Sequence, residues 1–288
     1  MTERVLICTD LDRTLIPNGH PPESPLARPL LRQLVERDEV YLAYVSGRDK
    51  MLLNEAIREW QLPMPDYAIG DVGTTLYAID GDHWQLMDAW QEEISHDWGN
   101  YQRSDIAGWL QDIDALTLQE PYKQNDYKLS YYAPADISPE TLLNDIRQRL
   151  DARPIRYNLI WSIDDFKQIG LLDILPQRAN KLEAIRFLMH SQDFPENSTV
   201  FSGDSGNDLE VLTSEIQATL VNNASDAIKQ LAADMAQKNG YADRLYIARG
   251  DFLDMNGNYA AGILEGLAHY IPDTLTWMID SISNDTGN

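Results

Sequence analysis

The sequence predicts an α/β protein in which a parallel sheet covered by helices is interrupted by an inserted α+β unit. Short apolar runs alternate with amphipathic segments in both outer parts of the chain. This alternation is typical of parallel strands joined by helices. Between these parts, from about Trp84 to about Gln168, the chain is dense in aromatic residues. We therefore expect a core formed by residues 1–83 and 169–288 and an inserted domain at residues 84–168.

Before the insertion, the hydrophobic pattern predicts buried strands in alternation with amphipathic helices. Pro29 falls near the start of the first helix, where a proline is tolerated. The apolar stripes of the two helices comprise Leu26, Leu30, Leu31, Leu34 and Val35 in the first and Leu52, Leu53, Ala56, Ile57 and Trp60 in the second. The expected elements are a strand at 5–9, a helix within 24–38, a strand at 39–48, a helix at 49–60, and a strand, glycine turn and hairpin within 66–84.

The inserted region predicts a mixed unit. Residues 126–134 and 155–164 have the pattern of strands, and residues 138–150 that of a helix capped by Ser138. We expect most of the aromatic side chains to form the unit's own core. They are Trp84, Trp90, Trp98, Tyr101, Trp109, Tyr122, Tyr127, Tyr131, Tyr132, Tyr157, Trp161 and Phe166.

After the insertion the α/β alternation resumes and continues almost to the end of the chain. The expected elements are a strand at 170–176, a helix at 180–190, a strand, loop and helix within 198–212, a strand at 216–224, helices at 225–237 and 259–271, and a polar tail at 283–288.

Charge and cysteine content restrict the classes of partner. The net charge of −23 repels nucleic acid and anionic membranes, and no apolar run reaches the roughly 18 residues of a transmembrane helix. Cys8 is the single cysteine, so a disulfide scaffold is excluded and a cytoplasmic location is expected. The five histidines lack the spacing of a zinc site. A phosphate site on this acidic chain would need local cations.

Polar residues stand at several of the predicted strand ends. Asp10 and Asp12 follow the first strand two residues apart, so their side chains point to the same side. Two anions there repel each other unless a cation or a shared proton separates them. Because parallel sheets bind ligands at the carboxyl ends of their strands, we expect these residues to meet. The full set is Asp10 and Asp12 after the first strand, Ser46 and Gly47 after the second, Lys181 at the opening of a helix, and Asp204 and Asp208 after the strand within 198–212.

Magnesium-dependent phosphoryl transfer is the chemistry that needs such a set. Mg²⁺ prefers oxygen ligands, and a phosphoryl group needs hydroxyl, N–H and ammonium donors around its oxygens. Asp10 would then attack phosphorus to form an aspartyl phosphate. Taken singly, each piece has an ordinary alternative as a turn, a helix cap or an exposed lysine. A calcium EF-hand loop does not fit, because its third ligand, its glycine and its closing glutamate are absent.

The segments "DLDRTLIP", "SGR", the later lysine and "GDSGND" resemble, in that order, the four motifs of the haloacid dehalogenase (HAD) superfamily. The resemblance implies a HAD-type, Rossmann-like sheet core. The insertion between the second and third motifs resembles the C2 cap of the Cof-like phosphatases. Finer details resemble the sucrose-6-phosphate phosphatase family, namely "VGTTLY", "YKLSYY", "LDILPQRANKLEAI", "ARGDF" and "AAGILEGL".

By this resemblance, Asp10 is the nucleophile and Asp12 the general acid and base. One departure from the family is Arg13, which stands where many members have glycine. It places a cation beside the site and requires the tight turn to form without glycine. The implied phosphoryl-binding residues are Ser46, Gly47 and Lys181, and the implied Mg²⁺-binding residues are Asp10, Asp12 through its backbone carbonyl, Asp204, and Asp208 in support.

The function implied is a Mg²⁺-dependent hydrolysis of sucrose 6-phosphate to sucrose and phosphate. Aromatic rings pack against the C–H faces of sugars, so the insertion suits sugar recognition. Tyr131 and Tyr132 alternate on a strand, so only one can face the site, and Lys128 is the cation expected to contact the sugar. The alternatives are a phosphatase of mannosylfructose, glucosylglycerol or trehalose phosphate, a phosphohexomutase, and a regulatory module that partners a sugar-phosphate synthase.

Overall fold

The computed structural model describes residues 4–164 and 167–285, which form a larger and a smaller sheet. In the larger sheet, β12, β11, β10, β1, β2 and β3 are parallel, and β4 and β5 add an antiparallel edge. The predicted parallel sheet and its hairpin are confirmed. The strands are β1 (Val5–Thr9), β2 (Val40–Val45), β3 (Tyr67–Gly70), β4 (Thr75–Asp80), β5 (His83–Leu86), β10 (Thr199–Gly203), β11 (Gln217–Leu220) and β12 (Leu245–Ile247).

Alternate residues of β1 enter two different hydrophobic clusters, one on each face of the larger sheet. Val5 and Ile7 pack with α1, α2, α9 and α10, whereas Leu6 and Cys8 pack with α3, α6, α7 and α8. The strand's two-residue period thus requires helices on both faces. The helices are α1 (Ala27–Val35), α2 (Lys50–Glu59), α3 (Asp88–Ser95), α6 (Lys181–Ser191), α7 (Leu209–Leu212), α8 (Asp226–Asn239), α9 (Ala260–Tyr270) and α10 (Asp273–Asp285).

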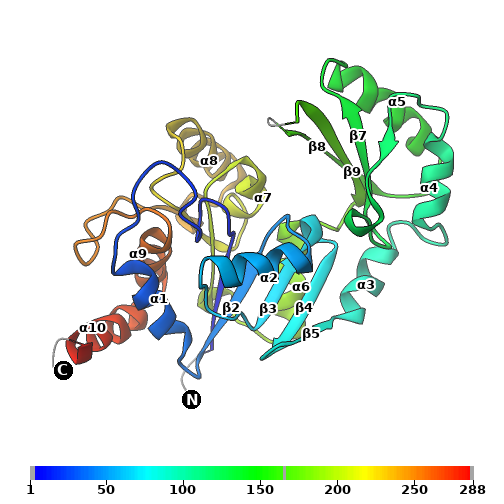
Figure 1. The fold of residues 1–288 in the computed structure, drawn as a ribbon. Coiled ribbons are helices and arrows are strands. Elements are labelled where there is room, and N and C mark those ends of the chain that lie inside the picture. Colours follow the sequence, from blue (N-terminus) through cyan, green and yellow to red (C-terminus); the bar gives the residue numbers. More distant parts are fainter. Residues whose placement is uncertain (1–3, 165–166, 286–288) are drawn as a thin grey trace.

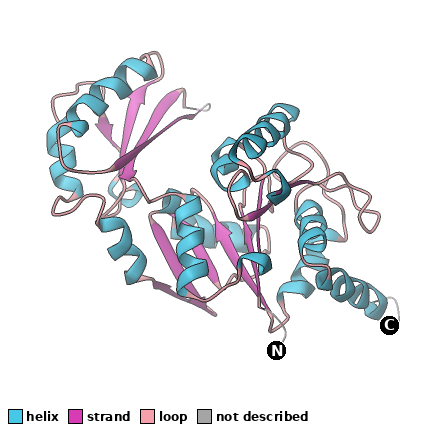
Figure 2. Ribbon diagram, turned by 180° about the vertical axis from the view of Figure 1, so that it is seen from behind, coloured by secondary structure: helices cyan, strands magenta, loops and turns pink. Residues whose placement is uncertain are grey.

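The smaller sheet is antiparallel, with the order β6-β7-β9-β8. Leu129 and Tyr131 of β7 and Leu172 and Ile174 of β9 point to one face, where they share a cluster with α4 and α5. Figures 1 and 2 show that the other face turns toward the side of the core that carries α7 and α8. The elements are α4 (Arg103–Leu110), β6 (Thr117–Leu118), β7 (Leu129–Pro134), α5 (Pro139–Asp151), β8 (Tyr157–Asp164) and β9 (Ile169–Pro176).

Sheet membership does not follow the limits predicted at residues 84 and 168. Trp84 packs in the core beside Tyr77, and the buried Trp90 donates through its indole nitrogen to the carbonyl of Gly73 (3.0 Å). At the other limit, β9 was predicted as a core strand but joins the smaller sheet. An apolar run indicates that a strand is buried, but it does not indicate which of the two sheets the strand joins.

The two chain crossings between core and cap lie side by side. Asp97 follows α3, and its carboxylate accepts a hydrogen bond from the backbone N–H of Arg178 (2.7 Å). The same carboxylate, fully buried, pairs with Arg156 at 2.7 Å. We propose that the cap domain begins after residue 97 and ends before residue 178.

Smaller predictions have mixed outcomes. Ser138 caps α5, as predicted, and Pro29 lies in the first turn of α1. Leu26 and Leu52 are exposed, so both predicted apolar stripes are narrower than expected. The sequence pattern missed α10, which occupies part of the predicted polar tail. Phe166 and residues 286–288 lie outside the described residues.

The remaining regular elements are single turns of 3-10 helix. They are η1 (Asp71–Gly73), η2 (Pro121–Lys123), η3 (Glu196–Ser198), η4 (Gly206–Asp208) and η5 (Ala242–Arg244). Across the described ranges, no helix has both the length and the apolar content needed to cross a membrane.

Candidate active site

Asp10 and Asp12 avoid each other's charge by pairing with different cations. Asp10 is buried directly after β1, and its carboxylate lies 2.8 Å from the ammonium of Lys181. Asp12 is half-buried and accepts two hydrogen bonds from Arg48, at 2.7 and 2.9 Å, and one from Asn18 at 2.9 Å. Burial of the Asp12 carboxyl acts to raise its pKa, but the Arg48 guanidinium holds the pKa of Asp12 below its usual range.

Lys181 joins two of the predicted aspartates. Asn180 caps the first turn of α6, which places Lys181 at the first helical position, where it is buried. Its ammonium lies 2.8 Å from Asp10 and 2.7 Å from Asp208. Burial alone would lower the pKa of Lys181, but the two carboxylates raise it above its usual value. The lysine therefore remains charged beside the predicted nucleophile.

Asp208 shapes the loop that follows β10. One of its oxygens accepts hydrogen bonds from the backbone N–H groups of Asp204 (3.1 Å) and Ser205 (3.3 Å). Gly203 has no room for a side chain, because a Cβ there would lie 2.6 Å from the carboxyl carbon of Asp208. The spacing of "GDSGND" is thus explained by a loop folded around Asp208, which positions Asp204.

The donor set fits a divalent cation. Oxygens of Asp10, Asp204 and Asp208 lie within 4.8 Å of one another. Burial, with further contributions from neighbouring carboxylates, raises the pKa of Asp10 to about 7. The Oδ2 atom of Asp204 is buried and has no hydrogen-bond partner. A hard cation such as Mg²⁺ would satisfy this oxygen and stabilise the ionised carboxylates. The side chain of Asp12 is not part of this cluster.

Ser46 and Gly47 follow β2 at the edge of the same site. Ser46 is buried, and its hydroxyl accepts a hydrogen bond from the N–H of Arg48 (3.2 Å). Gly47 is exposed, and a Cβ added there would meet no atom within 4 Å. A cavity of about 310 Å³ opens here. It is lined by Asp10, Asp12, Arg13, Ser46, Gly47, Arg48, Asp204, Ser205 and Asn207.

Lys128 does not line this cavity. It lies at the base of the cap, buried, with its ammonium 3.3 Å from the carboxylate of Asp71 in the core. Asn125 of the cap also donates to the hydroxyl of Thr74 (2.8 Å). The predicted sugar ligand is thus part of a contact between cap and core. Its contact with a sugar stays a prediction.

Sequence reasoning missed Arg48 and Asn18 as partners of Asp12. Arg48 was visible as the last letter of "SGR", but nothing in that tripeptide identified its partner. Asn18 lies in a loop without a pattern, and its amide reaches Asp12 only because the backbone turns back after Arg13.

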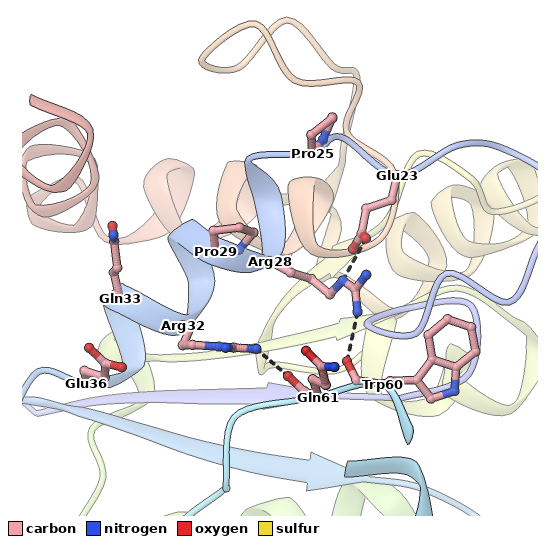
Figure 3. A pocket seen from close by; sticks show the side chains of 9 residues that line it. All are labelled: Glu23, Pro25, Arg28, Pro29, Arg32, Gln33, Glu36, Trp60 and Gln61. Atoms are coloured by element: carbon pink, nitrogen blue, oxygen red, sulfur yellow. Dashed lines mark hydrogen bonds and ion pairs between the residues drawn. The ribbon is translucent and has the colours of Figure 1, made fainter. Parts of the chain in front are cut away.

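A larger cavity, of about 490 Å³, lies between α1 and the end of α2 (Figure 3). Arg28 donates to the carbonyl of Trp60 (3.0 Å) and to Glu23 (2.7 Å), and Arg32 donates to the carbonyl of Gln61. Cations at a helix C-terminus stabilise its unpaired carbonyls. These arginines therefore have a structural explanation, and the smaller cavity with its aspartates is the candidate active site.

The fold and the cap are those of C2-capped hydrolases of the HAD superfamily. The crystal structure of the sucrose-phosphatase from a Synechocystis species, in complex with sucrose and phosphate, matches with a TM-score of 0.68 and 26% identity. The match covers 93% of this chain and 98% of that one. The chain belongs to the sucrose-6F-phosphate phosphohydrolase family, whose model matches residues 3–271. It is accordingly a phosphoric monoester hydrolase.

Three curated relatives are hydrolases or phosphatases by name. A HAD-like hydrolase of Nitrosococcus oceani is 54% identical over 96% of this chain and 75% of its own length. Sucrose-phosphatase 1 of Nicotiana tabacum is 27% identical over 93% of this chain, which spans 59% of that protein. Mannosylfructose-phosphate phosphatase of Agrobacterium fabrum is 29% identical over 92% of this chain and 96% of its own length.

Proposed function

We propose that the chain hydrolyses sucrose 6-phosphate to sucrose and phosphate, with Mg²⁺ and with Asp10 as the nucleophile. The observation that supports this most directly is the setting of Asp10. Its carboxylate is buried, lines the cavity and lies 2.8 Å from Lys181. Asp204, on the neighbouring strand's loop, supplies a carboxylate oxygen to the same cluster.

In the first step, a carboxylate oxygen of Asp10 forms a bond to phosphorus while the bond between phosphorus and the sugar oxygen breaks. The electron pair of the broken bond stays on the sugar oxygen, which takes a proton from Asp12. Arg48 and Asn18 hold Asp12 as a carboxylate. Asp12 therefore becomes a proton donor only after Arg48 has moved away from it.

In the second step, water attacks the aspartyl phosphate. Asp12, now a carboxylate, takes a proton from the water. The water oxygen bonds to phosphorus while the bond between phosphorus and the Asp10 oxygen breaks. Inorganic phosphate leaves and Asp10 is regenerated. The Arg48 ion pair favours the ionised form of Asp12 that this step requires.

Asp10 and Asp204 would bind Mg²⁺, with the backbone carbonyl of Asp12 as a further ligand. The bound cation would supply positive charge that stabilises the ionised Asp10 and the phosphoryl oxygens. Asp208 orients the loop of Asp204 and, through Lys181, is linked to Asp10. Ser46, the N–H of Gly47 and Lys181 would donate to the phosphoryl oxygens.

The cap would select the sugar. Tyr131 is buried in the cap core, whereas Tyr132 lies on the other face, where its hydroxyl accepts from Lys123 (2.7 Å) and donates to Glu120 (2.8 Å). A sugar hydroxyl would replace one of these two partners in its hydrogen bond with Tyr132. Lys128 would contact the sugar only after its ion pair with Asp71 is broken. The relative that acts on mannosylfructose phosphate makes this ester the second candidate substrate.

A phosphate-release screen with Mg²⁺ tests the proposal. The substrates are the phosphates of sucrose, mannosylfructose, glucosylglycerol, trehalose and simple hexoses, and Asp10→Asn is the control. The highest kcat/KM is expected for sucrose 6-phosphate. A higher value for another ester would replace the substrate, and an isomeric sugar phosphate in place of free phosphate would identify a mutase.

A further inference from the structure

Arg13 holds the aspartate that the proposed metal site depends on. Its guanidinium Nε lies 3.4 Å from Oδ2 of Asp204. That oxygen belongs to a side chain that is only 2% exposed and accepts no hydrogen bond, whereas the other oxygen, Oδ1, has the hydroxyl of Thr14 at 3.5 Å. The ion pair with Arg13 therefore compensates the charge on an otherwise unpartnered buried oxygen.

The backbone of Arg13 is held in a conformation that favours glycine. Its φ is 62°, in the left-handed region. The N–H of Arg13 donates to the side chain of Asn18 (2.8 Å), and its carbonyl accepts from the side chain of Asn223 (2.6 Å). Strained backbone that neighbouring groups maintain is enriched at functional sites. Here the turn aims a cation at Asp204, which glycine in this position could not provide.

We infer that Arg13 is a built-in counter-cation for Asp204, which Mg²⁺ must displace in order to bind. This inference rests on the proposed use of Mg²⁺. Two cations cannot share the same carboxylate oxygen closely without repulsion, so the ion pair and the metal compete. The Arg13 side chain is 53% exposed, which leaves it free to move away into the cavity that it lines.

The competition has two measurable consequences. The ion pair stabilises only the metal-free protein, so it lowers the affinity for Mg²⁺. Removing it should therefore strengthen Mg²⁺ binding and destabilise the metal-free form, while the metal-bound form is unaffected. A purely structural role for Arg13 would change the stability of both forms equally and would leave the affinity unchanged.

Isothermal titration calorimetry with Mg²⁺ alone, without substrate, tests the competition between Arg13 and Mg²⁺ on the full chain. Arg13→Gln keeps much of the side-chain length but removes the charge, and it should bind Mg²⁺ about three- to tenfold more tightly, as expected for a partly exposed ion pair. Arg13→Gly fits the left-handed backbone and serves if the glutamine variant folds poorly. Arg13→Lys keeps the charge and should stay closer to the wild type. Melting temperatures with and without Mg²⁺ provide the second readout.

Equal or weaker Mg²⁺ binding by both uncharged variants would overturn the inference and leave the proposed function intact. So would a loss of melting temperature that is the same with and without Mg²⁺. If the wild-type protein bound no Mg²⁺ at all, the proposed metal site would fail and the inference with it.

Discussion

The core site and the face of the cap sheet that carries Tyr132 both contain polar contacts of nearly equal length. The groups that form these contacts are buried in the core and partly exposed in the cap. In the core, Lys181 lies 2.7–2.8 Å from two carboxylates, and all three side chains are buried. In the cap, Tyr132 makes bonds of 2.7 and 2.8 Å to Lys123 and Glu120, whose side chains are 29% and 46% exposed.

Burial decides what each region can do. Electrostatic interactions are stronger and less easily exchanged in a low-dielectric interior than at a wet surface. The core therefore holds a fixed arrangement suited to the phosphoryl group that all candidate substrates share. The cap holds polar groups that can exchange partners with a sugar. We expect variants of the two regions to affect different kinetic constants.

The largest effect is expected from Asp10→Asn. The amide has almost the same volume but is a poor nucleophile, so kcat should fall by at least about 10⁴-fold with every substrate while the fold is retained. Phosphate release and circular dichroism are the measurements. More than a few per cent of wild-type activity, with deamidation excluded by mass spectrometry, would assign the attack to another group.

A smaller loss is expected when Asp204 is replaced by alanine. The variant lacks a proposed direct ligand, so activity should fall by at least about 100-fold and the Mg²⁺ activation curve should shift to higher concentration. Chelation should abolish wild-type activity, and added Mg²⁺ should restore it. An activation curve identical to that of the wild type would remove Asp204 from the set of metal ligands.

Asp12→Asn should distinguish between leaving groups. Loss of general acid and base assistance should slow sugar phosphates by about 10²- to 10⁴-fold. An aryl phosphate, whose leaving group needs little protonation, should be less impaired. The comparison is kcat/KM for sucrose 6-phosphate and for an aryl phosphate. An equal loss with both would indicate that Asp12 acts through the geometry of the site and not through its proton.

The smallest effect is expected in the cap. Tyr132→Phe removes one hydroxyl and should raise KM for the sugar phosphate by about two- to tenfold, with kcat for an aryl phosphate unchanged. Tyr131→Phe is the matched control, since that hydroxyl belongs to a side chain buried in the cap core. A KM that changes only in the Tyr131 variant would place the sugar elsewhere.

The same contrast explains what the sequence could predict. Asp10, Lys181 and Asp204 follow strands or open a helix, and strand ends in a parallel sheet meet at one edge, so their proximity could be predicted without coordinates. The partners of Asp12 and Asp204 could not. Arg48 and Arg13 reach these carboxylates through loop conformations. The sequence indicated a tight turn and a cation at Arg13, but not that its side chain pairs with Asp204.

The limits of the cap were harder to predict for a different reason. Trp84 lies where the aromatic content rises, but its ring packs in the core. Ile174 and Leu175 are adjacent in one apolar strand, and the first packs in the cap cluster while the second packs in the core cluster. The aromatic content of the sequence therefore rises before the cap begins, which we propose to be after residue 97. The α10 helix was missed because it depends on packing of Met278 against the core and not on a strong local signal.

The central claim is that the core performs the phosphate chemistry and the cap selects the sugar. Its most direct test is the ratio of kcat/KM for sucrose 6-phosphate to kcat/KM for a small aryl phosphate, before and after removal of the cap. Because Asp97 contacts the backbone of Arg178 directly, a short Gly/Ser linker can replace residues 98–177. The folded deletion variant is expected to hydrolyse the aryl phosphate weakly and to lose its preference for the sugar phosphate, because remote binding energy no longer assists the reacting centre. An unchanged ratio in a folded variant would contradict the claim.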